Sequence, residues 1–249
     1  MPSNDPSSVI CQQSSTLSSV IRHPSSNYHL LLDTSSNNGI VAISNGGKIL
    51  ISEENEQSKD HAAWLHDAVQ RIMEKAGIGM QDLKAVAAVA GPGSYTGLRV
   101  SLAAAKGFCY ALNIPLICIN TLELMARALQ PEAKTLSALI CPMIDARRDE
   151  VFTALYDADL REVMKPQPLI LDKMSFEHFL NDGRIIFSGS GAEKWRRITN
   201  THHAIFLAQP ILKETLAMMA QAAFERKDWP GLIEAEPVYL KEFYTHSKN

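Results

Sequence analysis

The run Tyr28-His-Leu-Leu-Leu-Asp33 is a short apolar segment that ends in an aspartate, and Leu139-Ile-Cys-Pro-Met-Ile-Asp145 repeats this pattern in the second half of the chain. After each copy come a polar turn and two more strand-like segments, at residues 39–44 and 48–53 in the first half and at residues 151–156 and 161–164 in the second. Repetition on this scale indicates duplicated units. Because helices and further strands follow in each half, the sequence predicts an α/β fold of two similar parts.

The two parts are expected to divide near residues 131–136. This gives an N-terminal unit over residues 28–131 and a C-terminal unit over residues 132–249. Residues 1–27 are rich in serine and lack apolar periodicity, so they predict a disordered N-terminal extension. The alternative interpretation is that the start of the chain was assigned in error, upstream of the true start. Neither interpretation gives this segment a function.

The composition narrows the possible functions. The 249 residues are 46% hydrophobic and 20% charged, as in ordinary globular proteins. With 24 Lys and Arg against 27 Asp and Glu, the net charge is -3. This argues against a protein whose main function is to bind nucleic acid, because such domains usually carry an excess of basic residues. The apolar runs are far shorter than the roughly 20 residues of a membrane span. The four cysteines form no C-x-x-C pair, which favours a reduced, cytoplasmic protein.

The aspartates that end the two repeated strands, Asp33 and Asp145, have two interpretations. In duplicated folds of this kind, such a carboxylate can hold a metal-bound phosphate. It can equally cap its own turn by accepting backbone hydrogen bonds. The pattern alone leaves both open.

The most distinctive motif is Gly91-Pro-Gly-Ser-Tyr-Thr-Gly-Leu-Arg99, which follows a predicted buried strand at residues 83–90 and opens a helix. Its glycines permit backbone angles closed to other residues, and the amides of a helix start can bind an anion. However, the spacing matches neither common phosphate-binding glycine motif. We therefore interpret the motif as a tight strand-to-helix turn shaped by Gly91, Pro92, Gly93, Ser94, Thr96, Gly97 and Arg99.

The helix predicted over residues 96–112 is apolar nearly all round, with one stripe of larger residues and one face of small residues. Such a helix must be buried on more than one side. A sheet can cover one side, and another helix of this chain or of a partner can cover the other. The preceding amphipathic helix, predicted over residues 58–76, can contribute to the same surface. The candidate interface residues are Leu65, Val69, Met73, Val100, Ala103, Ala104, Gly107 and Ala111.

No arrangement of side chains in the sequence predicts catalysis. His61 and His66 are five positions apart, so on a helix they point about 140° apart and cannot share a metal ion as an i, i+4 pair can. We find no nucleophile, base and acid pattern. The sequence therefore predicts no catalytic residue, no metal site and no cofactor.

The motif at residues 91–99 closely resembles the signature of the TsaB family, formerly called YeaZ. Leu31–Ser35 is similar to the family's first strand, Asp145–Phe152 to the opening of its second domain, and Pro237–Lys241 to its C-terminal segment. The resemblance covers about residues 28–243. It implies the duplicated fold of the actin, Hsp70 and sugar-kinase superfamily (ASKHA), with two ribonuclease-H-like domains.

The resemblance also implies a function. TsaB proteins are non-catalytic partners of TsaD in the complex that transfers a threonylcarbamoyl group to N6 of the adenosine next to the anticodon. TsaD carries an H-x-x-x-H metal motif, and His61 and His66 depart from that spacing. The implied partners are TsaD, through paired helices of the N-terminal domains, the ATPase TsaE, and tRNA indirectly, with a homodimer possible when the chain is alone. The alternatives are an ATP-dependent small-molecule kinase of the same superfamily and a metallopeptidase, a label attached to relatives.

Overall fold

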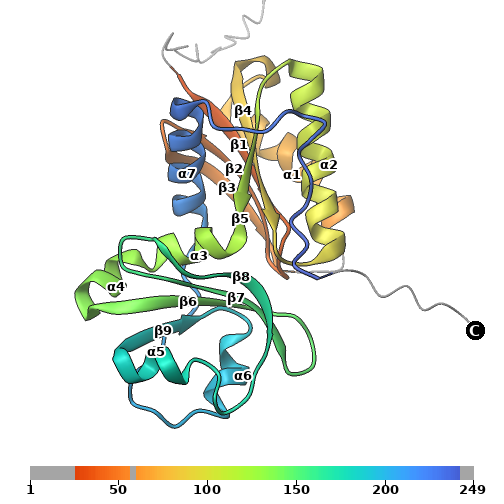
Figure 1. Cartoon of the computed structure of the whole chain (residues 1–249). Coiled ribbons are helices and arrows are strands. Elements are labelled where there is room, and N and C mark those ends of the chain that lie inside the picture. Colours follow the sequence, from red (N-terminus) through yellow and green to blue (C-terminus); the bar gives the residue numbers. More distant parts are fainter. Residues whose placement is uncertain (1–25, 57–59, 242–249) are drawn as a thin grey trace, which may run out of the picture.

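The computed structural model describes residues 26–56 and 60–241 (Figure 1). Residues 1–25, which make up nearly all of the expected N-terminal extension, lie outside the described residues. Two β-sheets, one above the other in Figure 1, are each flanked by helices.

The first sheet has five strands in the order β3-β2-β1-β4-β5. Antiparallel pairing joins β1 to β2 and β2 to β3, whereas β1, β4 and β5 pair in parallel. Gly46 and Gly47 connect β2 to β3 with φ of 56° and 77°, as a tight hairpin turn requires. The strands are β1 (Tyr28–Asp33), β2 (Gly39–Asn45), β3 (Lys48–Asn55), β4 (Leu83–Gly91) and β5 (Leu116–Asn120).

The second sheet repeats this topology, with the order β10-β9-β6-β7-β8. Here β6 pairs with β7 and β7 with β8 in antiparallel fashion, while β6, β9 and β10 are parallel. Each strand has the pairing of its counterpart in the first sheet, so the predicted duplicated ASKHA-like fold is confirmed. The strands are β6 (Ala138–Asp145), β7 (Glu150–Tyr156), β8 (Glu162–Ile170), β9 (Arg184–Ser188) and β10 (Ala204–Phe206).

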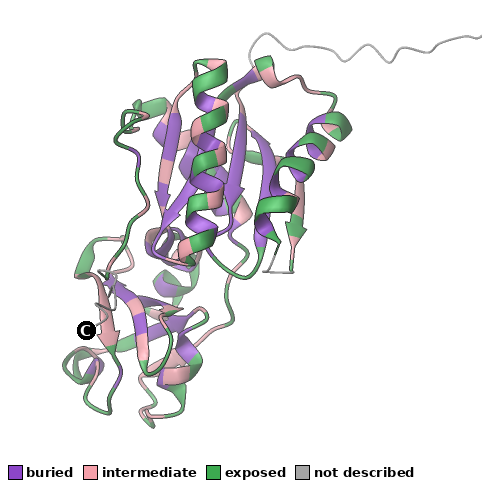
Figure 2. Cartoon of the chain, turned by 90° about the vertical axis from the view of Figure 1, so that its right-hand side faces the viewer, coloured by how far each residue is buried: buried purple, intermediate pink, exposed green. Residues whose placement is uncertain are grey.

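Two long helices, α1 (His61–Ala76) and α2 (Tyr95–Leu112), cover one face of the first sheet. The alternation of side chains along β1 sends Leu30 and Leu32 into the core beneath these helices and Leu31 into the core on the opposite face. Figure 2 views this side of the molecule, with buried strands behind helices whose outer surfaces are exposed.

The ends of α1 and α2 follow local sequence signals. Gly77 has the left-handed φ of 64° that ends α1, as its position after the apolar stripe predicts. The side chain of Ser94 accepts a hydrogen bond from the backbone N–H of Gly97 and caps the start of α2. Thr96 lies in the first turn of the helix. The remaining short elements of the first half are η1 (Met80–Asp82) and α3 (Thr121–Ala128).

The short helix α3 belongs to both cores. Leu124 and Met125 pack on the first sheet, while Leu122 and Ala126 pack on the second. The next helix, α4 (Gln130–Leu136), continues along the second sheet, whose other face is covered by α5 (Glu177–Asp182) and α6 (Ala192–Arg196).

After β10 the chain returns to the first sheet. Helix α7 (Lys213–Arg226) packs on the face of that sheet opposite α1 and α2, and its residues Leu216 and Ala220 are fully buried. Helical periodicity indicates that one face of this helix is buried, but it does not identify the sheet that covers that face. The division of the chain into units at residues 131 and 132 stays a prediction.

Candidate functional site

The glycines of the motif loop permit close contact with the loop that follows β1. A Cβ atom at Gly93 would lie 2.5 Å from the carbonyl oxygen of Ser35, and one at Gly97 would overlap the carbonyl oxygen of Thr34. The backbone N–H of Ser94 donates to the Ser35 carbonyl over 2.7 Å, and the Thr34 hydroxyl donates to the Gly97 carbonyl over 2.6 Å. The motif therefore joins β1 to the start of α2.

The C-terminal segment around Val238 packs against the same motif loop from the other side. The backbone N–H of Val238 donates to the carbonyl of Ala90 over 2.7 Å, and a Cβ atom at Gly91, where φ is +117°, would lie 2.8 Å from the Val238 carbonyl oxygen. Pro92 is buried beside Gly91. Sequence patterns reveal the short apolar segment near Val238, but they do not reveal this contact.

Arg99 lies between two aromatic rings at the start of α2. Its guanidinium carbon is 3.9 Å from the ring centre of Tyr95, and its Nε donates a hydrogen bond to the hydroxyl of Tyr239 over 3.0 Å. The pKa of Arg99 is raised, mainly because of this hydrogen bond. Arg99 thus holds the C-terminal segment against the motif.

The candidate interface residues fall into two groups. Leu65, Val69 and Met73 are buried beneath α1 in the core of the first sheet. On α2, Val100 and Ala104 are half-buried against the same core, whereas the outer face is exposed at Ala103, Gly107 and Ala111. A Cβ atom at Gly107 would meet nothing within 4 Å, and Tyr110 beside it is 82% exposed. As a partner surface, this set of residues stays a prediction.

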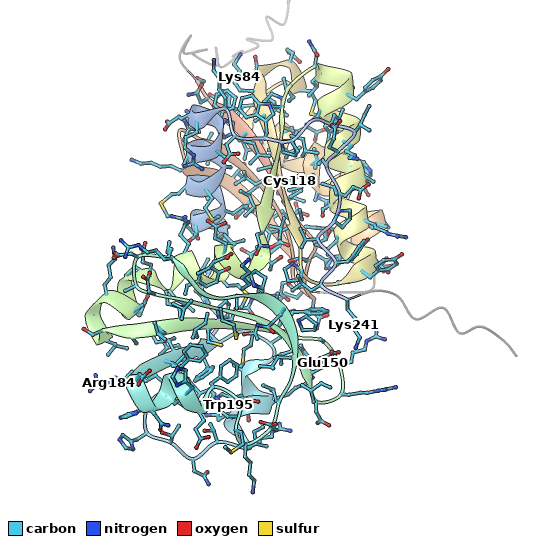
Figure 3. The ribbon with its side chains drawn as sticks, viewed as in Figure 1. Lys84, Cys118, Glu150, Arg184, Trp195 and Lys241 are labelled. Carbon is cyan, nitrogen blue, oxygen red and sulfur yellow. The ribbon has the colours of Figure 1, made fainter. Side chains whose placement is uncertain are left out.

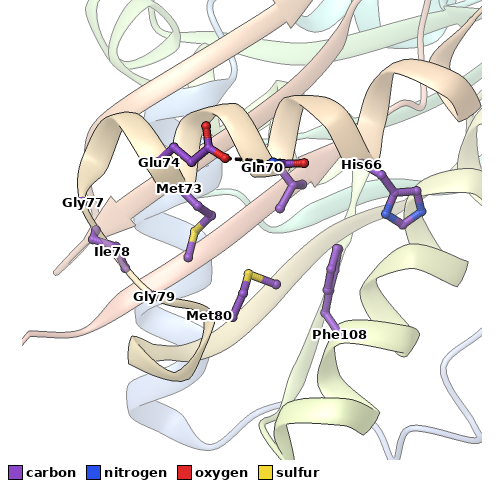
Figure 4. Close-up of a pocket in the computed structure, with 10 residues that line it drawn as sticks. His66, Gln70, Met73, Glu74, Gly77, Ile78, Gly79, Met80 and Phe108 are labelled. Carbon is purple, nitrogen blue, oxygen red and sulfur yellow. Dashed lines mark hydrogen bonds between the residues drawn. The ribbon is translucent and has the colours of Figure 1, made fainter.

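An apolar groove separates the C-terminal end of α1 from α2 (Figure 4). Its volume is about 600 Å³. Met73, Met80 and Phe108 line it, and the ring of His66 meets the ring of Phe108 edge-on with their centres 5.8 Å apart. Val69 and Met73 also line this groove, although both side chains are buried in the core.

A larger cleft of about 1340 Å³ lies between the two sheets. It contains the aspartates at the ends of β1 and β6. The carboxylate of Asp33 accepts the backbone N–H of Ser35 over 2.8 Å, and that of Asp145 accepts the backbone N–H of Arg147 over 2.6 Å. Of the two interpretations of these aspartates, turn capping is confirmed in both halves.

The electrostatic surroundings of the two aspartates differ. Asp33 is buried, and the loss of hydration raises its pKa. Burial also acts to raise the pKa of Asp145, but the hydrogen bonds from Lys194 and from the backbone N–H of Arg147 outweigh it, so that pKa is lowered. Lys194 Nζ lies 2.7 Å from the Asp145 carboxylate.

The two histidines on α1 have separate environments. His61 is buried, and its Nε2 lies 3.1 Å from the carbonyl oxygen of Ser36, whereas His66 is exposed at the groove. Within residues 26–56 and 60–241, no three His, Cys, Asp or Glu side chains gather as a metal ion would require. In the same ranges, no helix has the length and apolar character needed to cross a membrane.

Comparison with known proteins identifies a family. The model of the TsaD family, described as tRNA N6-adenosine threonylcarbamoyltransferase, matches residues 48–228. The protein TsaB of Escherichia coli, named for tRNA threonylcarbamoyladenosine biosynthesis, is 27% identical to this chain. The match covers 85% of this chain and 94% of the E. coli protein. Its Bacillus subtilis namesake is 30% identical over 57% of this chain, a match that spans only 62% of the relative's length.

The fold is similar to a solved structure as well. YeaZ from Pseudomonas aeruginosa superposes with a TM-score of 0.69 at 25% identity, over 86% of this chain and all of that protein. These relatives do not favour the small-molecule kinase alternative. The chain belongs to the family matched by the TsaD model and, within it, to the TsaB (YeaZ) group.

Proposed function

We propose that this chain is the non-catalytic, activating subunit of the complex that transfers a threonylcarbamoyl group to N6 of the adenosine next to the anticodon, in tRNAs that read codons starting with A. TsaD supplies the catalysis, the ATPase TsaE joins the pair, and tRNA is reached through the complex. The names of the relatives support the pathway. This role places the chain in the cytoplasm.

The outer face of α2 is the observation that carries the proposal. A helix surface of small side chains lets the backbone of a second helix approach closely, and an exposed aromatic residue beside it adds contact area. Ala103, Gly107 and Ala111 form such a surface, with Tyr110 at its edge. It fits a helix of TsaD, and in the absence of TsaD it fits a second copy of this chain.

The motif loop supports a role without phosphoryl or acyl chemistry. A loop that binds phosphate presents its backbone N–H groups to the ligand. Here the N–H of Ser94 donates to Ser35, and the space beside Gly91 and Gly93 holds carbonyl groups of Val238 and Ser35. Groups of the chain itself therefore contact the loop where a phosphate would bind. This agrees with a structural role for the motif.

The test is a reconstituted transfer assay. Unmodified tRNA, threonylcarbamoyl-AMP, ATP, TsaD and TsaE from one organism are incubated with and without this chain, and modified adenosine is counted. We expect modification to require the chain together with TsaD. The matched control omits TsaD and retains the chain, and no modification is expected in it.

Two results would contradict the proposal in different ways. Equal modification without the chain would remove the activating role. Modification by the chain without TsaD would show that it carries catalysis itself.

A further inference from the structure

The apolar groove between the C-terminal end of α1 and α2 presents side chains that are only partly covered. Ile78, Met80 and Phe108 line it, and all three are half-buried against the core of the first sheet. A concave, mostly apolar surface with a few polar groups at its edge is typical of a binding site. The groove is therefore a candidate docking surface for an apolar segment.

The polar edge of the groove carries a negative charge. Glu74 lines the groove with an exposed side chain, and its carboxylate accepts a hydrogen bond from Gln70 Nε2 over 2.8 Å. Within residues 26–56 and 60–241, this carboxylate forms no ion pair with a lysine or an arginine. The groove is thus complementary to an apolar segment that carries a positive charge at one end, because charge pairing across an interface fixes orientation.

The described chain begins at the same edge of the first sheet. Tyr28, the first residue of β1, pairs with Leu83 of β4, whose backbone N–H donates to the carbonyl of Met80. With neighbouring strands about 4.8 Å apart and a rise of about 2 Å per 3₁₀ residue, Tyr28 lies on the order of 10 Å from Met80. Figure 3 shows Lys84, the next residue of β4, at the end of the first sheet farthest from the second sheet. The residues before 26 are therefore attached close to the groove.

The sequence before residue 26 contains two matching apolar pairs. Ser-Ser-Val-Ile occurs at residues 7–10 and again at residues 18–21. The second copy is followed directly by Arg22, whereas the two residues after the first copy are uncharged. Only the second copy therefore combines the apolar pair with an adjacent cation, as the groove and its acidic edge require.

The second copy is also within reach of the groove. Ile21 precedes Tyr28 by seven residues, which span up to about 23 Å when extended and about 15 Å as a flexible coil. Both lengths exceed the separation of Tyr28 from Met80. A tether this short gives an effective concentration in the millimolar range, so that weak docking is still populated. For Ile10, which precedes Tyr28 by 18 residues, the effective concentration is about fourfold lower.

We propose that Val20 and Ile21 dock in the groove between α1 and α2 of their own chain, with Arg22 paired to Glu74. The two branched side chains cover the half-buried apolar side chains of the groove, and the ion pair sets the direction of the segment. This gives the N-terminal segment a binding role that its composition alone does not predict. The inference does not depend on the proposed function.

The docked segment lies beside the outer face of α2. Phe108 on the groove wall directly follows Gly107, which belongs to that face. A helix that binds the outer face must therefore accommodate the segment or displace it. Docking thus makes the N-terminal segment a competitor for part of the surface between the two helices.

The first experiment records NMR spectra of the full chain with ¹³C-labelled methionine methyl groups. The variant V20S/I21S removes the docking pair, and the matched control V9S/I10S makes the same two substitutions in the first copy. We expect the methyl resonance of Met80, assigned with M80L, to shift in V20S/I21S and to stay in place in the control. Met174, which is exposed in the second half of the chain, serves as an internal reference.

Three results would overturn the proposal. An unchanged Met80 resonance in both variants would show that the groove does not bind the segment. Equal shifts in V20S/I21S and V9S/I10S would show that the second copy has no special part. A Met80 shift that depends on protein concentration would assign the docking to a second copy of the chain.

The second experiment measures competition, and it does not depend on how the variants affect the segment itself. A fluorescein-labelled peptide with the sequence of residues 16–25 is titrated with protein and followed by anisotropy. We expect V20S/I21S to bind this peptide about tenfold more tightly than the natural chain does, because the natural segment competes for the groove. Equal binding, or no binding to either protein, would overturn the proposal.

The ion pair is tested with the same peptide. Adding E74Q to V20S/I21S should weaken binding, and R22Q in the peptide should then cause no further loss, as a double-mutant cycle requires for a direct pair. The matched control is E177Q, which neutralises an exposed glutamate of the second half and should leave binding unchanged. Independent losses from E74Q and R22Q would contradict the pairing of Arg22 with Glu74.

Discussion

The guanidinium group of Arg99 donates a hydrogen bond to the hydroxyl of Tyr239, and this contact joins the N-terminal part of α2 to the C-terminal segment of the described chain. The neighbouring bond from the Val238 N–H to the Ala90 carbonyl depends on the same docking. Tyr239→Ala should therefore raise the hydrogen-exchange rate of the Val238 amide on the order of tenfold. Tyr239→Phe keeps the ring contact with Tyr95 and should give a smaller increase. Unchanged exchange in both variants would show that the segment docks without this residue.

Replacing either of two glycines of α2 by alanine should change the free energy of unfolding, and the two changes should have opposite signs. At Gly97 the new Cβ would overlap the Thr34 carbonyl, so Gly97→Ala should lower the free energy of unfolding by about 2–3 kcal/mol. At Gly107 the space is open and the backbone helical, so Gly107→Ala should raise it by about 0.5–1 kcal/mol. Urea denaturation of both variants checks the pair. A stabilising Gly97→Ala would show that the loop after β1 moves freely.

The small-residue face of α2 can be tested with a bulky substitution. Gly107→Leu should weaken association with TsaD at least tenfold while the melting temperature stays unchanged or rises, because the new side chain projects from the exposed face. Gly183→Leu is the matched control, since Gly183 also has open space around it but lies in the second half of the chain. Association is measured by analytical ultracentrifugation. Equal affinities for the two variants would remove Gly107 from the interface.

The aspartates at the ends of β1 and β6 should affect stability in opposite directions. Asp33 has a raised pKa, so its ionisation costs folding free energy above the unfolded-state pKa, and Asp33→Asn should stabilise the protein at pH 7. Asp145 has a lowered pKa, so its stabilisation is present at pH 7 and is lost as the pH falls through its folded-state pKa. Asp145→Asn should therefore destabilise at pH 7. Urea denaturation at pH 7 and pH 3 tests both, and the Asp33→Asn effect should vanish at the lower pH. Effects of the same sign at pH 7 would contradict the assignment.

His29 on β1 should make the fold sensitive to acid. Its ring is buried against Phe224 of α7, neither ring nitrogen has a hydrogen-bond partner among the described residues, and burial lowers its pKa to about 4. Because the unfolded chain takes up the proton near pH 6.5, stability should fall as the pH drops from 6.5 to about 4, by up to about 3 kcal/mol. His29→Phe should flatten this part of the stability curve. An identical acid transition in the variant would place the sensitivity elsewhere.

The repeated strands show what the sequence predicts well. An apolar run of strand length ending in aspartate is a local signal, so β1 and β6 and their following hairpins can be located without a structure. The contact of Gly97 with Thr34 cannot, because it joins segments far apart in the chain. The same limit applies to α7, since helical periodicity identifies a buried face without identifying the sheet that buries it.

The candidate interface illustrates a related ambiguity. Leu65, Val69 and Met73 form the apolar stripe of α1, and a stripe of this kind packs on whatever lies nearest. In this fold it packs on the chain's own first sheet. The small face of α2 remains outside that core because the sheet is already covered by the opposite stripe of the same helix, which includes Leu98 and Leu102.

The two-sided packing of α3 has a consequence for motion. Rotating one sheet against the other would pull either Leu124 or Leu122 out of a core, and each exposed leucine costs about 1.5–3 kcal/mol. The aperture between the sheets is therefore set when the chain folds, and any ligand must fit it as it stands. It also follows that the two halves melt in a single cooperative transition, because neither core is complete without the helix that they share.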